Sequence, residues 1–348
     1  MRSFVTSLCS DACAGRRTGT AGGREARRLV VEALRRAGLD PHEQAIPGNG
    51  GANVLATIPA AGAPADRWVI VAAHYDHLGA ESGATGSVFR GADDNAAAVG
   101  ILLSVAGRLA ASPPERRNVL VAAFDAEEPP FFTTQQMGSE HWARQPTVPL
   151  DRIDWMVCMD LVGHSLGPAG LPDPVRQTVF ALGAERSAGT SALLDSMSES
   201  EPGVIVRRAD AEIIDPLSDH APFWQRQIPF VFLSNGRSRV YHTPEDTPDK
   251  LDWDKMAATA RWLERFVRAT CARPEARAEF RERRDDASTL RAFLAITDPL
   301  RAVSTEARMG HQIAGALLAA CDSDGRLRTE DERLTMLGLA NHLETALG

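Results

Sequence analysis

The amino-acid sequence predicts an α/β fold in which a largely parallel sheet is covered by helices on both faces. Short apolar runs rich in β-branched residues alternate with longer helical patterns, as in proteins with buried parallel strands. From about Arg273 the sequence becomes rich in Arg and Glu and poor in strand patterns, which predicts about three helices. We therefore expect a first domain at residues 1–272 and a helical C-terminal extension at residues 273–348.

The first half of the chain is predicted to contain a packing helix, three strands and a core helix. An amphipathic pattern predicts a helix at Arg24–Ala37, which Gly38 ends. The following elements are a strand at 53–58, a buried strand within 68–77, a helix opened by the acidic pair 93–94, and a buried strand within 118–128.

The second half continues the same alternation. The pattern predicts a helix starting near Gly138, a strand from Ile153, an outer helix at Arg176–Met197, a short helix after Ser218, a strand from Ile228 and a helix from Asp254 to about Cys271. The loop from Pro129 to Met137 contains Phe131 and Phe132, which either form a pocket wall or fill a local core.

Composition limits the classes of partner. The net charge is −8, from 38 Lys and Arg against 46 Asp and Glu, and the basic residues are scattered, so we expect no nucleic-acid or anionic-lipid partner. No apolar run approaches membrane-spanning length, and the five cysteines lack a metal-type CxxC spacing. The first residues lack the apolar core of a secretory signal, so we expect a cytoplasmic protein, or a secreted one if a leader was removed.

Polar side chains stand where several predicted strands end. His74, Glu127, Glu128 and Asp160 follow three apolar runs, and His242 lies just beyond a fourth. In parallel sheets these ends share one edge, where binding sites form. Each residue alone has an ordinary structural explanation, such as a helix cap or a strand-end turn, but their joint appearance favours a metal centre.

Two histidines with several carboxylates suit zinc, and a carboxylate can bridge two zinc ions about 3.5–4 Å apart. Asp94, at the head of a helix, is suited to bridge. His74 and Asp160 then complete one site, and His242 and Glu128 the other. Glu127 is left free to act as the general base.

An ordered set of motifs resembles metallopeptidase family 28, the co-catalytic dizinc aminopeptidases. The motifs are HYDHLG (74–79), GADDNAAAV (91–99), FDAEE (124–128), MDLVG (159–163), SDHAPF (218–223) and YHTPEDTPDKL (241–251). The resemblance covers roughly residues 8–272 and implies a three-layer α/β/α sandwich with a mostly parallel mixed central sheet.

The resemblance also implies roles for individual residues. By motif position the metal ligands are His74, Asp94, Glu128, Asp160 and His242, with a cis peptide after the bridging Asp94. Glu127 is the acid/base, and Asp76 orients His74. Asp219, His220 and Asp246 match motif positions as supporting groups.

These features lead to one hypothesis and two alternatives. The hypothesis is an aminopeptidase with two Zn²⁺ per chain, which acts on peptides with a free N-terminus through a metal-bridging hydroxide and Glu127.

Two departures from the family pattern are the Pro129–Met137 loop, where many members have a short Gly-rich turn, and Ala97-Ala98 in place of a Ser-Gly pair.

A longer loop after the Glu pair is similar to that of the related glutaminyl cyclases, which use one zinc ion. Those enzymes favour tryptophans in the pocket, where this chain has Phe131, Phe132 and Tyr241. The second alternative is a binding protein that has the peptidase fold but has lost the catalytic activity. The complete set of metal ligands argues against this alternative.

Overall fold

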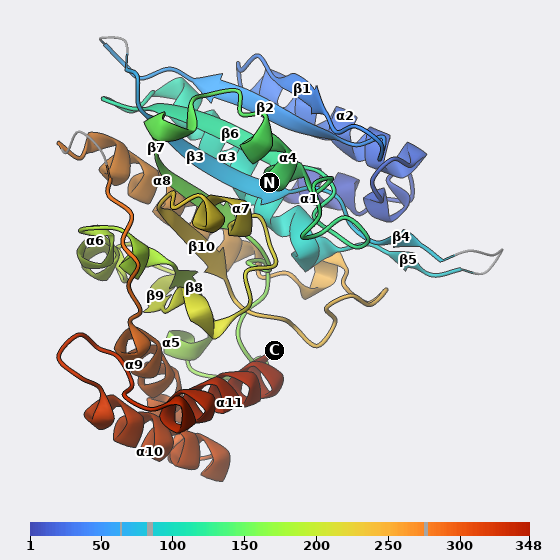
Figure 1. Cartoon of the computed structure of the whole chain (residues 1–348). Coiled ribbons are helices and arrows are strands. Elements are labelled where there is room, and N and C mark those ends of the chain that lie inside the picture. The colour runs from blue at the N-terminus through green and yellow to red at the C-terminus, as the bar shows by residue number, and fades with distance from the viewer. Residues whose placement is uncertain (63–64, 82–85, 275–277) are drawn as a thin grey trace.

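The computed structural model describes residues 1–348 except 63–64, 82–85 and 275–277 (Figure 1). A mixed sheet forms its centre. Its strands are β1 (His42–Ala45), β2 (Ala52–Ile58), β3 (Trp68–His74), β6 (Asn118–Phe124), β7 (Ile153–Met159), β8 (Thr178–Leu182), β9 (Ile205–Ala209) and β10 (Phe230–Ser234). A separate short pair consists of β4 (Gly79–Ala80) and β5 (Val88–Phe89).

The eight strands lie in the order β1-β2-β6-β3-β7-β10-β8-β9. The four middle strands β6, β3, β7 and β10 run parallel to one another, and β8 runs parallel to β9. The pairs β1–β2, β2–β6 and β10–β8 are antiparallel. The prediction of a mostly parallel mixed sheet is therefore confirmed.

Helices cover both faces of the sheet. One apolar core lies under α1 (Arg2–Leu8), α2 (Ala21–Arg36), α3 (Ala97–Ala111), α6 (Thr190–Met197) and α8 (Trp253–Ala272), and a second lies under α4 (Gly138–Arg144) and α7 (Ala221–Gln225). A π-type turn, Ala92–Ala96, precedes α3, and α5 (Asp173–Arg176) precedes β8. Short 3₁₀ turns lie at Ala14–Arg16, Leu150–Arg152, Ala184–Arg186, Ala211–Ile213, Pro248–Lys250 and Asp298–Leu300.

Alternation along β6 explains why its sequence is apolar throughout. Val119 and Val121 enter the core that includes α3 and α8, whereas Leu120 and Phe124 enter the opposite core. Successive side chains of a strand point to opposite faces, so a strand covered on both sides must be apolar at every position. The helical stretch Ala92–Ala111 is apolar enough in composition to cross a membrane, but it is largely buried within this fold.

One sequence prediction needs correction. The outer helix expected at Arg176–Met197 is wrong, because residues 178–182 form β8 and α6 begins only at Thr190. Gly183 and Gly189 adopt φ values of 90° and 75°, which interrupt a continuous helix there. The strand expected within 118–128 is confirmed as β6, which ends at Phe124, so Glu127 and Glu128 stand on the loop that follows it.

Three helices follow the described part of the linker: α9 (Asp286–Thr297), α10 (Thr305–Ala320) and α11 (Glu330–Leu347). Together they occupy the lower end of the molecule in Figure 1. Leu290 and Phe293 of α9 share an apolar cluster with Leu166 and Val175 of the preceding sequence. The three expected helices are confirmed, and the domain boundary at residue 272 stays a prediction.

A buried carboxylate ties the sheet to the segments around it. Asp154 of β7 is fully buried and accepts hydrogen bonds from the guanidinium of Arg67 and, at 2.5 Å, from Nε of Arg117. The N–H of Ala278 also donates to Asp154 at 3.3 Å. One side chain therefore holds the starts of two central strands and the segment beyond α8.

Asp154→Ala is expected to lower the free energy of unfolding by about 3–5 kcal/mol, because it removes the fully buried carboxylate that pairs with the guanidinium groups of Arg67 and Arg117. Chemical denaturation measures the change. Asp66→Ala is the matched control, because its ion pair with Arg152 is exposed to solvent and contributes little. Equal, small effects of both substitutions would contradict this role of Asp154.

Candidate metal centre

Three parallel strands bring their polar ends to one place. His74 is the last residue of β3, Asp160 directly follows β7, and the Glu pair lies on the loop after β6. His74 Nε2 lies 3.5 Å from Asp94 Oδ1 and 3.5 Å from Asp160 Oδ1. These three side chains form a first group of ligand-type atoms, and one ion could contact all of them.

A second group forms on the other oxygen of Asp94. His242 Nε2 lies 3.0 Å from Asp94 Oδ2 and 3.2 Å from Glu128 Oε2. Asp94 thus offers one carboxylate oxygen to each group, as a bridging ligand does. The structure brings all five predicted ligands together: His74, Asp94, Glu128, Asp160 and His242.

Several of these atoms are buried yet form no hydrogen bond among the described residues. They include both ring nitrogens of His74, Nε2 of His242 and Oδ1 of Asp160. Buried polar atoms are almost always paired, and unpaired atoms that converge on a point suit a bound cation. The donor set therefore fits divalent metal ions.

His77 is a residue that the sequence analysis did not assign. Its Nδ1 lies 2.8 Å from Glu128 Oε1 and 3.9 Å from Asp94 Oδ2, and its buried Nε2 has no hydrogen-bond partner in the part of the chain that the structure describes. His77 could itself hold an ion together with Asp94 and Glu128, or it could orient Glu128 by a hydrogen bond. The sequence signal that could have identified His77 is its position three residues after His74, in the same polar stretch that follows a buried strand.

Two buried aspartates hold the loops in place. Asp76 accepts the N–H groups of Glu127 at 3.1 Å and Glu128 at 3.2 Å, and its Oδ1 lies 3.5 Å from His74 Nδ1. Asp246 accepts the N–H groups of Asp93 at 2.8 Å and Asp94 at 3.1 Å. The predicted orienting residue Asp76 therefore also fixes the Glu pair.

The backbone around the site has unusual conformations. The Asp94–Asn95 peptide is cis, as the family resemblance implies. Ala126, Leu161 and His242 have φ values of 59°, 57° and 56°, a region that L residues rarely adopt. Such residues concentrate at functional sites, where the surrounding structure holds them.

Arg16 is a supporting residue without a sequence signal. Its side chain is fully buried, and it donates to the carbonyl oxygens of Tyr75 at 2.8 Å, Gly91 at 2.6 Å and Asp94 at 3.0 Å. It therefore ties the N-terminal segment to the residue that follows His74 and to the turn that carries Asp94. These partners are far away in sequence, so no local pattern reveals them.

Burial and charge set the protonation of the site. Burial raises the pKa of the Glu127 carboxyl well above its usual range, and the neighbouring Asp160 and Glu128 raise it further against the effect of His74. Burial also raises the pKa of Glu128, but the adjacent imidazoles of His242 and His77 outweigh it and lower the pKa to about 2. Glu127 therefore differs from its neighbour in its affinity for a proton.

Glu127 also differs in position. Its Oε2 lies 3.8 Å from His74 Nε2, so it stands beside the first group without bridging to the second. Phe131 and Phe132, on the loop after the Glu pair, are half-buried and belong to none of the three apolar core clusters of the described residues. That placement does not support the alternative in which they fill a local core.

Known proteins resemble this chain in sequence and in fold. Residues 53–267 match the model of peptidase family M28. An uncharacterized protein of Escherichia coli, YfbL, is 29% identical over 255 residues, which cover 66% of this chain and 74% of that protein.

Two solved structures share the fold at low sequence identity. The zinc aminopeptidase BSAP of Bacillus subtilis is 14% identical with a TM-score of 0.62, covering 81% of this chain and 97% of that one. The glutaminyl cyclase of Porphyromonas gingivalis is 20% identical with a TM-score of 0.59, covering 77% and 96%. These likenesses establish the fold alone.

His77→Ala is expected to weaken divalent-metal binding about 10–100-fold, because Glu128 loses the imidazole that fixes it. Titration of the metal-free protein with Co²⁺, followed by visible absorption, measures the affinity. His42→Ala, in the exposed part of β1, is the matched control. Unchanged Co²⁺ affinity in His77→Ala would show that His77 does not act on the metal centre.

Proposed function

The chain belongs to peptidase family M28, and on that premise we propose that it is a zinc-dependent aminopeptidase that removes N-terminal residues from peptides. The observation that carries the proposal is the pair of ligand groups sharing Asp94, with Glu127 beside them. Of the four carboxylates Asp94, Glu127, Glu128 and Asp160, Glu127 is the one that belongs to neither ligand group. A metal centre with a separate proton carrier is the arrangement that peptide hydrolysis needs.

The donor atoms suit zinc in particular. Imidazole nitrogen and carboxylate oxygen are the ligands of catalytic zinc sites. His74, Asp94 and Asp160 would hold one ion, and His242, Asp94 and Glu128 the other. Zinc supplies Lewis acidity, which polarises a carbonyl group and lowers the pKa of a bound water to about 7.

Charge balance supports a pair of ions. Asp94, Glu128 and Asp160 carry three negative charges when ionised, and their three side chains are almost entirely shielded from solvent. Two divalent cations add four positive charges, which leaves one positive charge to stabilise an anion in the site. A single divalent ion would leave the centre negative.

Glu127 is the proposed carrier of the proton. It accepts a proton from the attacking water on its side chain and returns it to the amine that leaves. Burial raises the pKa of its carboxyl above the usual range, which favours the uptake of a proton from water. Asp76 positions Glu127 through the backbone N–H at 3.1 Å.

The second candidate is a glutaminyl cyclase, since both kinds of enzyme share this fold. Tyr241 stacks on His242 with ring centroids 3.8 Å apart, so an aromatic surface lies directly at the centre. Such a surface suits an apolar substrate side chain as well as a glutaminyl one. The number of bound zinc ions and the accepted substrate therefore distinguish an aminopeptidase from a glutaminyl cyclase.

Glu127→Gln is expected to lower kcat about 10²–10⁴-fold because the carboxylate that moves the proton is lost. Zinc content should stay at the wild-type value, because Glu127 belongs to neither ligand group. Steady-state kinetics on leucyl-nitroanilide and elemental analysis are the two measurements, and Glu43→Gln in β1 is the exposed control. Near wild-type turnover in Glu127→Gln would remove Glu127 from the proposed mechanism.

Wild-type protein should contain about two zinc ions per chain and hydrolyse aminoacyl-nitroanilides, with activity lost on chelation and restored by zinc. Elemental analysis and a substrate panel that includes an N-terminal glutaminyl peptide test both points. One zinc ion with cyclisation of the glutaminyl peptide would instead establish the cyclase. Absence of both reactions in metal-replete protein would rule out both enzymes.

A further inference from the structure

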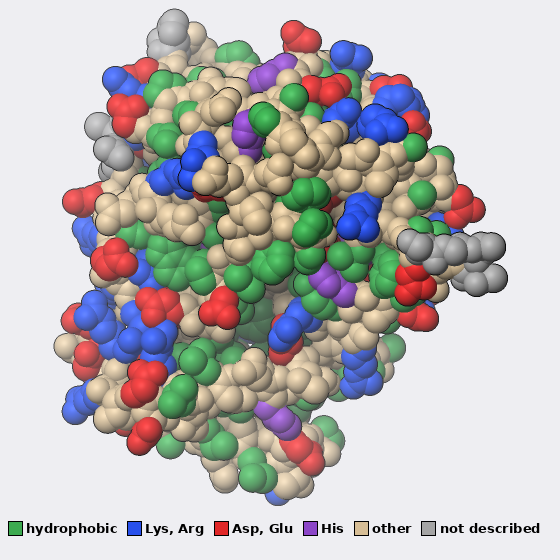
Figure 2. Space-filling view, turned by 45° about the vertical axis from the view of Figure 1, so that its right-hand side comes forward, with side chains coloured by type: hydrophobic (Ala, Val, Ile, Leu, Met, Phe, Trp, Pro, Cys, Tyr) green, Lys and Arg blue, Asp and Glu red, His purple; other side chains and the backbone are tan. Residues whose placement is uncertain are grey.

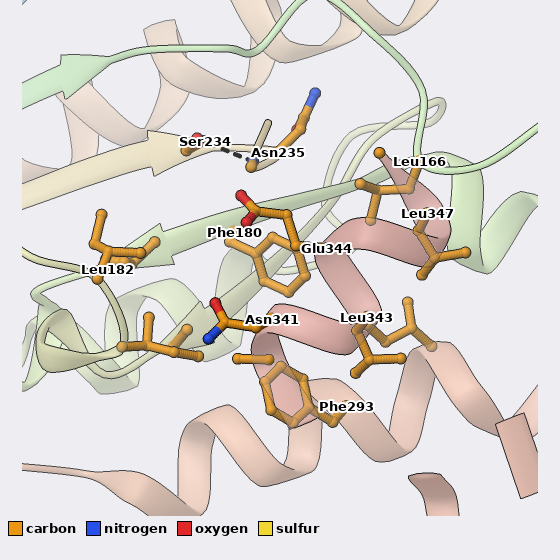
Figure 3. Close-up of a pocket in the computed structure, with 17 residues that line it drawn as sticks. Leu166, Phe180, Leu182, Ser234, Asn235, Phe293, Asn341, Leu343, Glu344 and Leu347 are labelled. Carbon is orange, nitrogen blue, oxygen red and sulfur yellow. Dashed lines mark hydrogen bonds between the residues drawn. The ribbon is translucent and has the colours of Figure 1, made fainter. Parts of the chain in front are cut away.

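An apolar cavity of about 120 Å³ lies between the sheet and the C-terminal helices. Figure 3 shows Phe180 and Leu182 of β8 on one side, and Leu343 and Leu347 of α11 with Phe293 of α9 on the other. The cavity is smaller than the roughly 300–1,000 Å³ of sites that enclose a drug-sized ligand. Its size therefore suits a single side chain rather than a whole peptide.

One wall of this cavity adjoins the metal centre through the backbone. Ser234 and Asn235, at the end of β10, line the cavity. The N–H of Asp160 donates to Leu233 O at 3.0 Å, and the N–H of Asn235 donates to Leu161 O at 3.1 Å. Asn235 of the wall is therefore hydrogen-bonded to Leu161, the residue that follows the predicted ligand Asp160, and Leu233, which precedes the wall, is bonded to Asp160 itself.

Two exposed apolar side chains lie on the segment that leads from the cavity to Ser218, one in the cavity wall and one beside a neighbouring pocket. Ile214 lines the cavity and is 41% exposed, and Leu217 is 47% exposed. Ser218 follows, and its Oγ lies 3.3 Å from Asp160 Oδ2. Figure 2 shows hydrophobic side chains gathered on this face, which is hollowed above the C-terminal helices.

Helix α11 also holds the segment that leads to His242. Glu344, which lines the cavity, accepts the backbone N–H of Arg237 at 2.9 Å and its Nη2 at 2.5 Å. The ion pair is partly exposed, so its effect on stability is small. Its geometric effect is to fix α11 against the loop between β10 and His242.

We propose that this cavity accepts the apolar side chain of the N-terminal residue of the substrate, so that the C-terminal helices contribute to specificity. The inference rests on the proposed aminopeptidase function. It gives α11 a part in the reaction: it forms one wall of the cavity and holds the segment before His242. A leucine or phenylalanine side chain loses contact with water there, whereas alanine leaves the cavity unfilled.

Filling the cavity tests the proposal. Ala340 lines the cavity from α11, whereas Ala346 lies on the exposed side of the same helix. Ala340→Phe should lower kcat/KM for leucyl-nitroanilide at least about 10-fold, mainly through KM, and leave alanyl-nitroanilide nearly unchanged. Ala346→Phe adds the same bulk and should change neither substrate. Equal effects of Ala340→Phe on both substrates would overturn the proposal.

A second variant and a binding assay keep the test decisive if Ala340→Phe folds poorly. Ile214→Ser removes apolar surface at an exposed position and should weaken the preference for leucyl over alanyl substrates about 10-fold. In zinc-loaded Glu127→Gln protein, calorimetry should show that L-leucinamide binds more tightly than L-alaninamide, and that Ala340→Phe abolishes the difference.

These readouts separate the two hypotheses. Binding of leucinamide that does not depend on the cavity variants would contradict the pocket inference even if the protein is an aminopeptidase. Lack of turnover with every aminoacyl substrate would contradict the proposed function, while the calorimetry would still decide whether the cavity binds an apolar side chain.

Discussion

Buried negative charge at the carboxyl edge of the sheet is the constraint on which this structure depends. Asp76, Asp94 and Glu128 are nearly inaccessible to solvent, and Asp160 lies 3.5 Å from His74. Burying an ionised carboxylate without compensation is very costly. Backbone N–H groups compensate Asp76, whereas Asp94 and Glu128 face imidazoles and Asp160 faces the His74 imidazole and the Ser218 hydroxyl. Divalent cations are the groups best suited to balance that charge.

The rest of the fold holds these carboxylates in position. Parallel strands deliver them to one edge, Asp246 fixes the turn that carries Asp94, and Arg16 fastens that turn to the N-terminal segment. The C-terminal helices act from the other side, where Glu344 binds Arg237 ahead of His242. Segments from both ends of the chain thus support a site whose ligands come from its middle.

Much of the site could be predicted because its signals are local. An apolar run that is followed by a histidine or an acid indicates both a buried strand and the place where that strand ends. The carboxyl ends of parallel strands share one edge of the sheet, so the sequence predicts that His74, Glu128 and Asp160 lie close together. Arg16 could not be predicted, since its carbonyl partners are distant in sequence. The sequence predicts a helix where the structure has strand β8, because a short apolar run such as Thr178–Leu182 is compatible with either structure. The glycines that follow it, Gly183 and Gly189, are the signal against a continuous helix.

The central claim is that two metal ions share Asp94. Crystals of the zinc-loaded protein, with diffraction recorded just above and just below the zinc absorption edge, test it most directly. The account predicts two anomalous peaks, one against His74 and Asp160 and one against His242 and Glu128, with Asp94 touching both. A single peak, or two peaks that do not share Asp94, would contradict it.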